Sequence, residues 1–161
     1  MAVSFFTSER VVKTSHAGLS VIKKWEGFRS KPYLCPAGVA TIGYGSTVYP
    51  DGRAVSLRDP SITEAQAVEI LAATLVKYED AVRRYTANAK KPISQNQFDA
   101  LVSFAYNVGI GNLQKSSLLR LVNAGNFAGA GREFGKWVFA KGKKLQGLVD
   151  RRADESYLFA S

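Results

Sequence analysis

The sequence predicts an α+β protein, mainly α, with a small lobe around a short antiparallel sheet and a larger helical lobe. Between residues 28 and 57, glycines separate short runs rich in Val, Thr, Ile and Tyr, a pattern typical of two or three strands. From residue 63 onward, apolar residues recur every three or four positions, as on the buried face of a helix. We therefore expect one domain, with residues 16–62 as its small N-terminal part, 63–161 as its helical lobe and 1–15 as an N-terminal arm.

Several helix ends can be placed from side chains that bond free backbone groups. Ser15 predicts the start of a first helix of about ten residues, and Gly27 predicts its end, directly after Glu26. Thr63 and Ser94 are each followed three residues later by Gln, which is the signature of a capping box. Long helices are therefore expected to begin at these two positions.

The last third of the chain is helical in pattern and basic in charge. Shorter helices are expected around residues 118–122 and 127–137, and a basic helix over residues 145–159. Residues 141–144, which are Lys-Gly-Lys-Lys, suggest a mobile loop. The whole chain has a formal net charge of +9, which predicts an anionic partner.

Composition also argues against several classes of protein. The basic charge comes with no nucleic-acid-binding motif, so no nucleic-acid partner is expected. No stretch approaches the ~20 apolar residues of a membrane span, and the N-terminus lacks the features of a signal peptide. Cys35 and His16 are the only residues of their kinds, so an internal disulfide, a His-based triad and a multi-His metal site are not expected. We expect no metal and no cofactor.

One short stretch carries the most chemistry. Glu26 stands at the end of the first predicted helix, and Cys35 and Thr41 follow in the Gly-rich, strand-like segment. A carboxylic acid that faces two groups able to hold or activate a water has the minimum equipment for hydrolysing a glycosidic bond.

Motifs along almost the whole chain resemble those of the bacteriophage lysozymes (endolysins) of glycoside hydrolase family 24. The matching segments, in order, are Glu26-Gly27, Cys35, 41–45, 62–67, 97–104, 107–109, 117–119, and 147–152 with Glu155 and 158–159. Each fragment is weak evidence by itself, but their order and spacing are specific. The resemblance implies a lysozyme-like fold with an active-site cleft between the two lobes. It also implies hydrolysis of the β-1,4 bond between N-acetylmuramic acid and N-acetylglucosamine in peptidoglycan, which lyses the host at phage release.

The resemblance assigns roles to three residues. Glu26 matches the general acid that protonates the leaving oxygen, and Thr41 matches the residue that positions the attacking water. Cys35 stands where most relatives have Asp. It could act as a thiolate whose pKa is lowered by nearby Arg or Lys, as a neutral water-holder or as a covalent nucleophile, and the last of these fits an inverting family least.

Further residues are candidates for binding the glycan. Tyr44 and Tyr49 in the small lobe, and Gln114 and Ser117 in the helical lobe, have the aromatic faces and polar groups that sugar sites use. Arg152 matches a family arginine near the catalytic acid, and we expect it to pair with Glu26 or to steady the cleft.

Two alternative functions remain open at this point. A lytic transglycosylase would also use a glutamate, and a basic module that binds the wall or disrupts membranes would need only charge. The partners expected are peptidoglycan glycan strands and an anionic envelope surface that the basic C-terminal helix contacts through Arg151 and Arg152. We expect a monomer that stays in the host cytoplasm until a separate pore-forming protein releases it to the wall.

Overall fold

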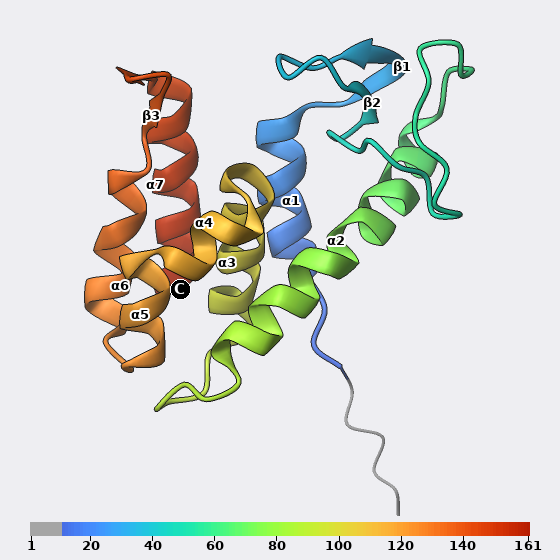
Figure 1. Cartoon of the computed structure of the whole chain (residues 1–161). Coiled ribbons are helices and arrows are strands. Elements are labelled where there is room, and N and C mark those ends of the chain that lie inside the picture. The colour runs from blue at the N-terminus through green and yellow to red at the C-terminus, as the bar shows by residue number, and fades with distance from the viewer. Residues whose placement is uncertain (1–10) are drawn as a thin grey trace, which may run out of the picture.

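The computed structural model describes residues 11–161, and the first lobe in the chain is small and holds a single short sheet (Figure 1). Its elements are α1 (His16–Glu26), β1 (Arg29–Leu34) and β2 (Ala40–Gly43). The strands pair antiparallel, with Tyr33 opposite Thr41. Two isolated bridges, Ile42–Ser46 and Val48–Ala54, continue the β structure beyond β2. The prediction of a small antiparallel sheet is therefore confirmed.

The rest of the chain is mainly helical, as predicted. Its elements are α2 (Glu64–Thr86), α3 (Gln95–Val108), α4 (Ile110–Lys115), α5 (Ser117–Asn123), α6 (Phe127–Glu133), the 3₁₀ turn η1 (Phe134–Lys136), β3 (Phe139–Ala140), β4 (Lys143–Lys144) and α7 (Gln146–Ala160). The long helix α2 runs from the small lobe into the helical lobe (Figure 1). None of the helices within residues 11–161 is both long and apolar enough to cross a membrane.

Both predicted capping boxes are confirmed. The Thr63 hydroxyl accepts a hydrogen bond from the backbone N–H of Gln66, whose side chain accepts one from the N–H of Thr63. Ser94 and Gln97 make the same reciprocal pair at the start of α3. These bonds use backbone donors that a helix end leaves free, which is why two local sequence signals place α2 and α3 correctly.

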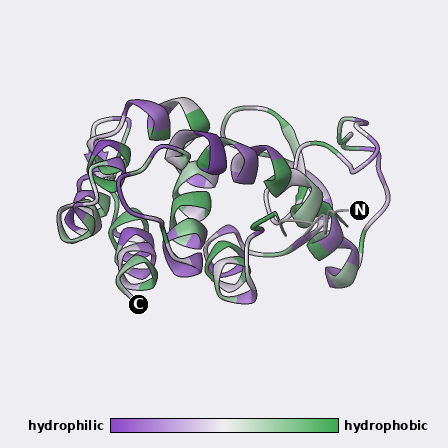
Figure 2. Ribbon diagram, turned by 90° about the horizontal axis from the view of Figure 1, so that it is seen from below, coloured by the Kyte–Doolittle hydropathy of each residue, from purple (hydrophilic) through white to green (hydrophobic). Residues whose placement is uncertain are grey.

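The core is organised around α3, which packs against α1, α2 and α7. Its Phe98, Leu101, Val102 and Phe104 are all at most 2% exposed. The other helices turn one apolar side toward this core, and in Figure 2 most of them carry both hydrophobic and hydrophilic colours. Such two-sided helices bury a stripe and leave the rest to solvent.

The chain just before α1 is fastened to the helical lobe. Ser15 occupies the predicted N-cap position, but its side chain does not cap α1. Instead the backbone N–H and the hydroxyl of Ser15 both donate to the Asp99 carboxylate on α3, and the N–H of Thr14 donates to Glu79 on α2. The remainder of the predicted arm, residues 1–10, lies outside the described residues.

Two elements of the helical lobe differ from the sequence expectations. The short helix α4 was not predicted, because six residues that follow Gly109 give no clear period. The expected mobile loop at residues 141–144 is part of a β-hairpin, β3–β4, whose turn residues Lys141 and Gly142 both have positive φ (49° and 76°). That conformation matches the twist of a two-residue hairpin.

The closing helix is found as predicted, but its paired arginines are not at the surface. Arg151 is 4% exposed and Arg152 is 1% exposed. Both are buried where α7 packs against α3, and the Glu155 carboxylate pairs with each of them. They are therefore not the surface charges that the predicted contact of this helix with an anionic envelope requires.

Candidate active site

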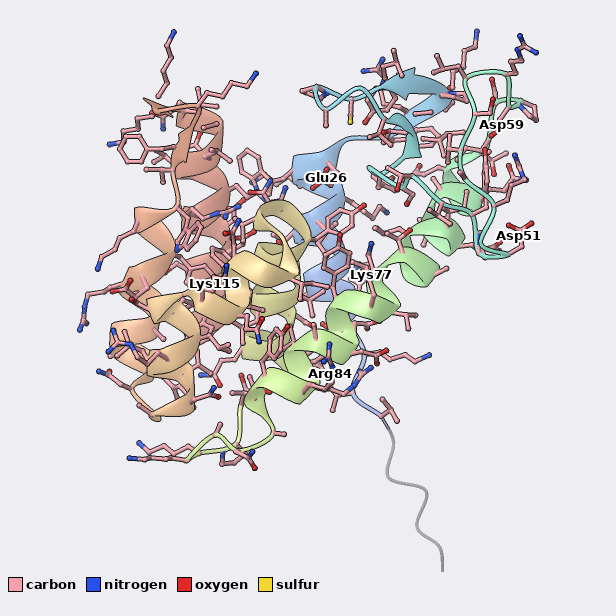
Figure 3. All side chains as sticks on the ribbon, viewed as in Figure 1. Glu26, Asp51, Asp59, Lys77, Arg84 and Lys115 are labelled. Carbon is pink, nitrogen blue, oxygen red and sulfur yellow. The ribbon has the colours of Figure 1, made fainter. Side chains whose placement is uncertain are left out.

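Glu26 is the last residue of α1 and keeps its carboxylate at the junction of the two lobes (Figure 3). Gly27 ends the helix with a φ of 70°, a conformation that glycine adopts without strain. The Glu26 Oε1 atom accepts a hydrogen bond of 2.8 Å from Nη1 of Arg151 on α7. The Glu26 side chain is 21% exposed, so it is held by the protein and still reachable from solvent.

Arg151 belongs to a buried group of charges behind Glu26. Its Nε atom donates to Oε1 of Glu155 at 3.1 Å, and its Nη2 donates to the carbonyl of Ser103 at 3.3 Å. The Ser103 hydroxyl also donates to Glu155, at 2.8 Å. Because the guanidinium is planar and all these partners are buried, Arg151 holds one orientation toward Glu26.

Glu155 balances a second arginine as well. It is fully buried, and its Oε2 atom lies 3.0 Å from Nε of Arg152. Burial raises the pKa of Glu155, while the two guanidiniums beside it oppose that rise by favouring the carboxylate. Burial likewise lowers the pKa of Arg152. One carboxylate thus compensates two buried cations, with Glu26 as the second acid within reach.

Gly45, in the loop after β2, approaches the other oxygen of Glu26. A Cβ atom at this position would lie 3.0 Å from Glu26 Oε2 and 3.1 Å from the Tyr106 hydroxyl. Gly45 also has a φ of 85°. Both the backbone conformation and the close approach therefore require glycine here.

Two tyrosines from the helices complete the surroundings of Glu26. Tyr106 on α3 and Tyr78 on α2 pack edge to face, with ring centroids 5.1 Å apart. Burial raises the pKa of each hydroxyl, and the nearby Glu26 charge raises it further. The Tyr106 hydroxyl donates to the carbonyl of Tyr44 at 2.7 Å, which ties α3 to the small lobe beside Glu26.

The small sheet brings Tyr33, Cys35 and Thr41 close together. Tyr33 and Thr41 are cross-strand partners, and Cys35 directly follows the end of β1, within reach of the Thr41 hydroxyl. Burial is the main cause that raises the pKa of Tyr33. The positive charge of Arg29 lowers it, and the negative charges of Glu26 and Cys35 raise it further. Tyr33 is therefore within electrostatic range of both the acid and the thiol.

Cys35 is partly exposed in the turn between β1 and β2, and its thiol environment favours ionisation. The pKa of Cys35 is lowered chiefly by the backbone N–H of Val39, then by that of Ala37, with a smaller contribution from the Thr41 hydroxyl. Donors that bond an anion stabilise it. The thiolate alternative is thus favoured by the turn backbone and Thr41, rather than by a neighbouring Arg or Lys.

Thr41 is buried, and its hydroxyl donates to the carbonyl of Val39 at 2.9 Å. A hydroxyl has one proton to donate, so the same group can turn toward a Cys35 thiolate only by leaving that carbonyl. Thr41 and Cys35 are therefore linked through Val39. The N–H of Val39 donates to the thiol sulfur, and the carbonyl of Val39 accepts from the Thr41 hydroxyl.

The predicted glycan-binding tyrosines differ in how open they are. Tyr44 is 3% exposed and donates to Oε1 of Glu64 at 2.8 Å, and burial with this bond raises its pKa to about 12. Its ring has no free face for a sugar, which does not fit the expected role. Tyr49 is half-buried, donates to Asp59 at 2.9 Å and lines a groove of about 450 Å³ against α2.

The two candidates in the helical lobe, Gln114 and Ser117, are exposed at the end of α4 and the start of α5. Ser117 lines a hollow of about 410 Å³ together with Lys115, Lys136 and Trp137. Their roles in glycan binding, like that of Tyr49, stay predictions.

One of the two expectations for Arg152 was that it pairs with Glu26, and this was wrong. Its Nη2 atom donates to Asn107 at 2.5 Å, and its guanidinium lies over the Phe104 ring, 5.1 Å from the centroid. The arginine that reaches Glu26 is the preceding one, Arg151. Sequence reasoning also missed Tyr33, and nothing in the sequence distinguished it from an ordinary strand residue.

No group of three or more His, Cys, Asp or Glu side chains within residues 11–161 is arranged to hold a metal ion. The groups that the site offers for chemistry are the Glu26 carboxyl group, the Cys35 thiol and the hydroxyls of Thr41 and the neighbouring tyrosines.

Known proteins are similar to this chain over most of its length. The profile of the Phage lysozyme family matches residues 23–155. An endolysin of Bacillus phage B103 is 43% identical over 150 residues, which is 90% of this chain but only 53% of that relative, so the chain spans about half of its length. An endolysin from Escherichia coli O157:H7 phage FAHEc1 has a structure with a TM-score of 0.80 and 38% identity, covering 91% of this chain and 92% of that one. The muramidase domain of SpmX from Asticaccaulis excentricus gives a TM-score of 0.78 and 35% identity, covering 92% and 98%.

Proposed function

Because this chain belongs to the phage lysozyme family, we propose that it hydrolyses the β-1,4 glycosidic bond between N-acetylmuramic acid and N-acetylglucosamine in peptidoglycan. This activity would lyse the host cell at phage release. The observation that carries the proposal is the position of Glu26, which is fixed by Arg151 on one side, closely approached by Gly45 on the other, and still open to solvent.

In the proposed reaction Glu26 is the general acid. It gives its proton to the glycosidic oxygen as the bond to the sugar breaks and positive charge develops on the ring. Arg151 keeps the carboxyl group in place before the transfer and stabilises the carboxylate that remains after it. A carboxylic acid in this role contributes roughly 10²- to 10⁴-fold to the rate.

Cys35 and Thr41 are proposed to hold the attacking water. An anionic thiolate would orient the water and also stabilise the developing positive charge, as an Asp does at this position in most relatives. The backbone N–H groups of Val39 and Ala37 lower the pKa of Cys35, so they stabilise the anion of this side chain. A direct attack by sulfur on the sugar remains the least favoured route, because family members invert configuration through water.

Peptidoglycan glycan strands are thus the proposed partner, and no cofactor is required. We also propose that the protein acts as a monomer, and that a separate pore-forming protein lets it pass from the host cytoplasm to the wall. Size-exclusion chromatography with light scattering tests the first point. For the second, cells that make this protein alone should stay intact until a pore-forming protein is induced.

The decisive experiment is the substitution Glu26→Gln, assayed by the loss of turbidity of peptidoglycan suspensions. The rate should fall by about 10²- to 10⁴-fold in protein that circular dichroism shows to be folded at the assay temperature, although the loss of the charge beside Arg151 lowers its unfolding temperature. Glu69→Gln removes the same charge from the exposed face of α2 and serves as the control. If both variants were equally active, Glu26 would not be the acid.

Mass spectrometry of the products then identifies the reaction class. Hydrolysis adds one water and leaves a reducing end, whereas a lytic transglycosylase would leave a cyclic anhydro sugar. A product with the anhydro mass would contradict the hydrolase proposal while leaving Glu26 as the acid.

A further inference from the structure

Two stretches of the chain are basic and contain no acidic residue. Residues 27–50 carry Arg29 and Lys31, and residues 134–149 carry four lysines, with no Asp or Glu in either stretch. Each stretch forms a hairpin, β1–β2 in the small lobe and β3–β4 in the helical lobe. Both hairpins lie at the same end of the molecule, at the top of Figure 1, although they are far apart in the sequence.

The tips of these hairpins also expose large apolar side chains. At the small-lobe tip (residues 34–39), Leu34 is 58% exposed and Val39 is 47% exposed. At the helical-lobe tip (residues 139–145), Phe139 is 61% exposed and Leu145 is 44% exposed. Leu57 and Tyr157 are exposed to a similar degree elsewhere on the described surface, so the two tips are distinguished by their apolar side chains together with the charges beside them.

The lysines of the helical-lobe tip are free to bind an external anion. Lys141, Lys143 and Lys144 form no salt bridge with any residue in the described part of the chain. Lys144 stands directly opposite Phe139 in the hairpin, so a cation and an aromatic ring share one face. The turn through Lys141 and Gly142 keeps the tip short.

We propose that the two hairpin tips dock this protein onto an anionic lipid bilayer surface. Lysines are drawn to acidic headgroups, with about a fivefold gain in partition for each one near the surface. Phe139, Leu145, Leu34 and Val39 then enter the boundary between headgroups and acyl chains, as the apolar side of an interfacial segment does. A soluble polyanion would attract the lysines equally well, but it offers nothing to Leu34 and Val39.

Docking in this way would also cover Cys35. The cysteine lies between Leu34 and Val39 in the turn, and the backbone N–H of Cys35 bonds the Val39 carbonyl at 3.0 Å. Insertion of the two apolar neighbours brings the thiol to the lipid surface. Bilayer binding and access to Cys35 should therefore exclude each other.

The test measures partition of the full chain onto vesicles of phosphatidylglycerol and phosphatidylcholine in equal parts, by co-sedimentation. The variant K141Q/K143Q/K144Q should bind about 100-fold more weakly than the wild type. The variant R84Q/K90Q/K91Q is the matched control and should lose little. It removes three exposed charges from the end of α2 and the loop that follows, at the opposite end of the molecule from the two hairpins (Figure 1). An equal loss in both variants would show charge attraction without a docking site and would overturn the proposal.

Two further measurements separate a bilayer from a soluble polyanion. Phe139→Ser keeps every charge, and it should weaken vesicle binding by roughly tenfold because the ring no longer enters the lipid. Alkylation of Cys35 by iodoacetamide should slow on vesicles in the wild type and in the control variant, but not in the triple-lysine variant. If Phe139→Ser had no effect, and an inorganic polyphosphate chain slowed alkylation as well as vesicles do, the partner would be a soluble polyanion. None of these readouts depends on glycan hydrolysis, so the proposal stands or falls separately from the proposed function.

Discussion

The helical side and the sheet side of Glu26 are built by different means. On the helical side, Arg151 and Glu155 are almost fully buried and joined by charged hydrogen bonds. On the sheet side, Cys35 lies partly exposed in a four-residue turn that is held mainly by backbone hydrogen bonds. Buried charges fix one geometry at a cost in desolvation, whereas backbone N–H groups tune the pKa of a thiol at little cost. The difference suggests that the helices orient the acid and the hairpin sets the charge of the group on the other side.

The largest expected effect tests the buried side. Glu155→Ala should lower the free energy of unfolding by about 3–5 kcal/mol, because it leaves the buried Arg151 and Arg152 with too little compensating charge. Denaturation in urea, followed by circular dichroism, measures this loss.

Glu133→Ala is the matched control for that variant. Glu133 also pairs with a cation three residues away, Lys136, but that lysine is 70% exposed. The loss there should be about 0–1 kcal/mol, as for surface pairs in general. Equal losses in the two variants would mean that burial does not distinguish the helical side.

A second effect tests how closely the two sides meet at Glu26. Gly45→Ala places a methyl group 3.0 Å from Glu26 Oε2, so it should reduce kcat by roughly 10- to 100-fold through displacement of the acid. Gly52→Ala is the control, because Gly52 has a similar φ of 90° but no atom within 4 Å of the added methyl. Both variants should lose about 1–2 kcal/mol of stability from the positive φ. A similar loss of activity in both would assign the effect to backbone strain rather than to Glu26.

The smallest expected effect concerns the charge on the sheet side. The pKa of Cys35 is lowered, yet a thiol still ionises at higher pH than a carboxylic acid. If the anion is the active form, wild-type kcat/KM falls as pH drops through the thiol pKa. In the Cys35→Asp variant the carboxylate stays charged at lower pH than the thiolate does. The fall in kcat/KM should therefore occur more than about 1 pH unit below that of the wild type.

Rates of iodoacetamide alkylation against pH report the Cys35 pKa without reference to activity. They should follow the acid limb of the wild-type kcat/KM profile. An acid limb shared by the wild type and Cys35→Asp would instead favour a neutral thiol that only holds water. Cys35→Ala should reduce activity sharply under either reading.

The sequence analysis succeeded where the signals are local. The Gln residues after Thr63 and Ser94 bond the same helix ends that they cap, so α2 and α3 were placed correctly. Gly27 likewise ends α1 directly after Glu26. Each of these signals acts within four residues and needs no knowledge of the rest of the fold.

It failed where the outcome depends on which side of a helix faces a neighbour. Arg151 and Arg152 are adjacent in sequence, but successive helical residues point about 100° apart. The packing of α7 against α3 turns Arg151 toward Glu26 and Arg152 toward Asn107. The burial of Tyr44 against Phe28 and its bond to Glu64 similarly join residues from separate elements.

The sequence by itself thus determined the two-part division of this protein, the starts of its main helices, its family and the position of one acid at a helix end. Only the tertiary structure decided which arginine holds that acid, why Gly45 must lack a side chain, and what lowers the pKa of the thiol. The physical reason is range: caps and glycine turns are set by bonds between near neighbours in the chain. Charge compensation and close approach in a buried site depend instead on atoms that folding brings together from α1, the small sheet, α3 and α7.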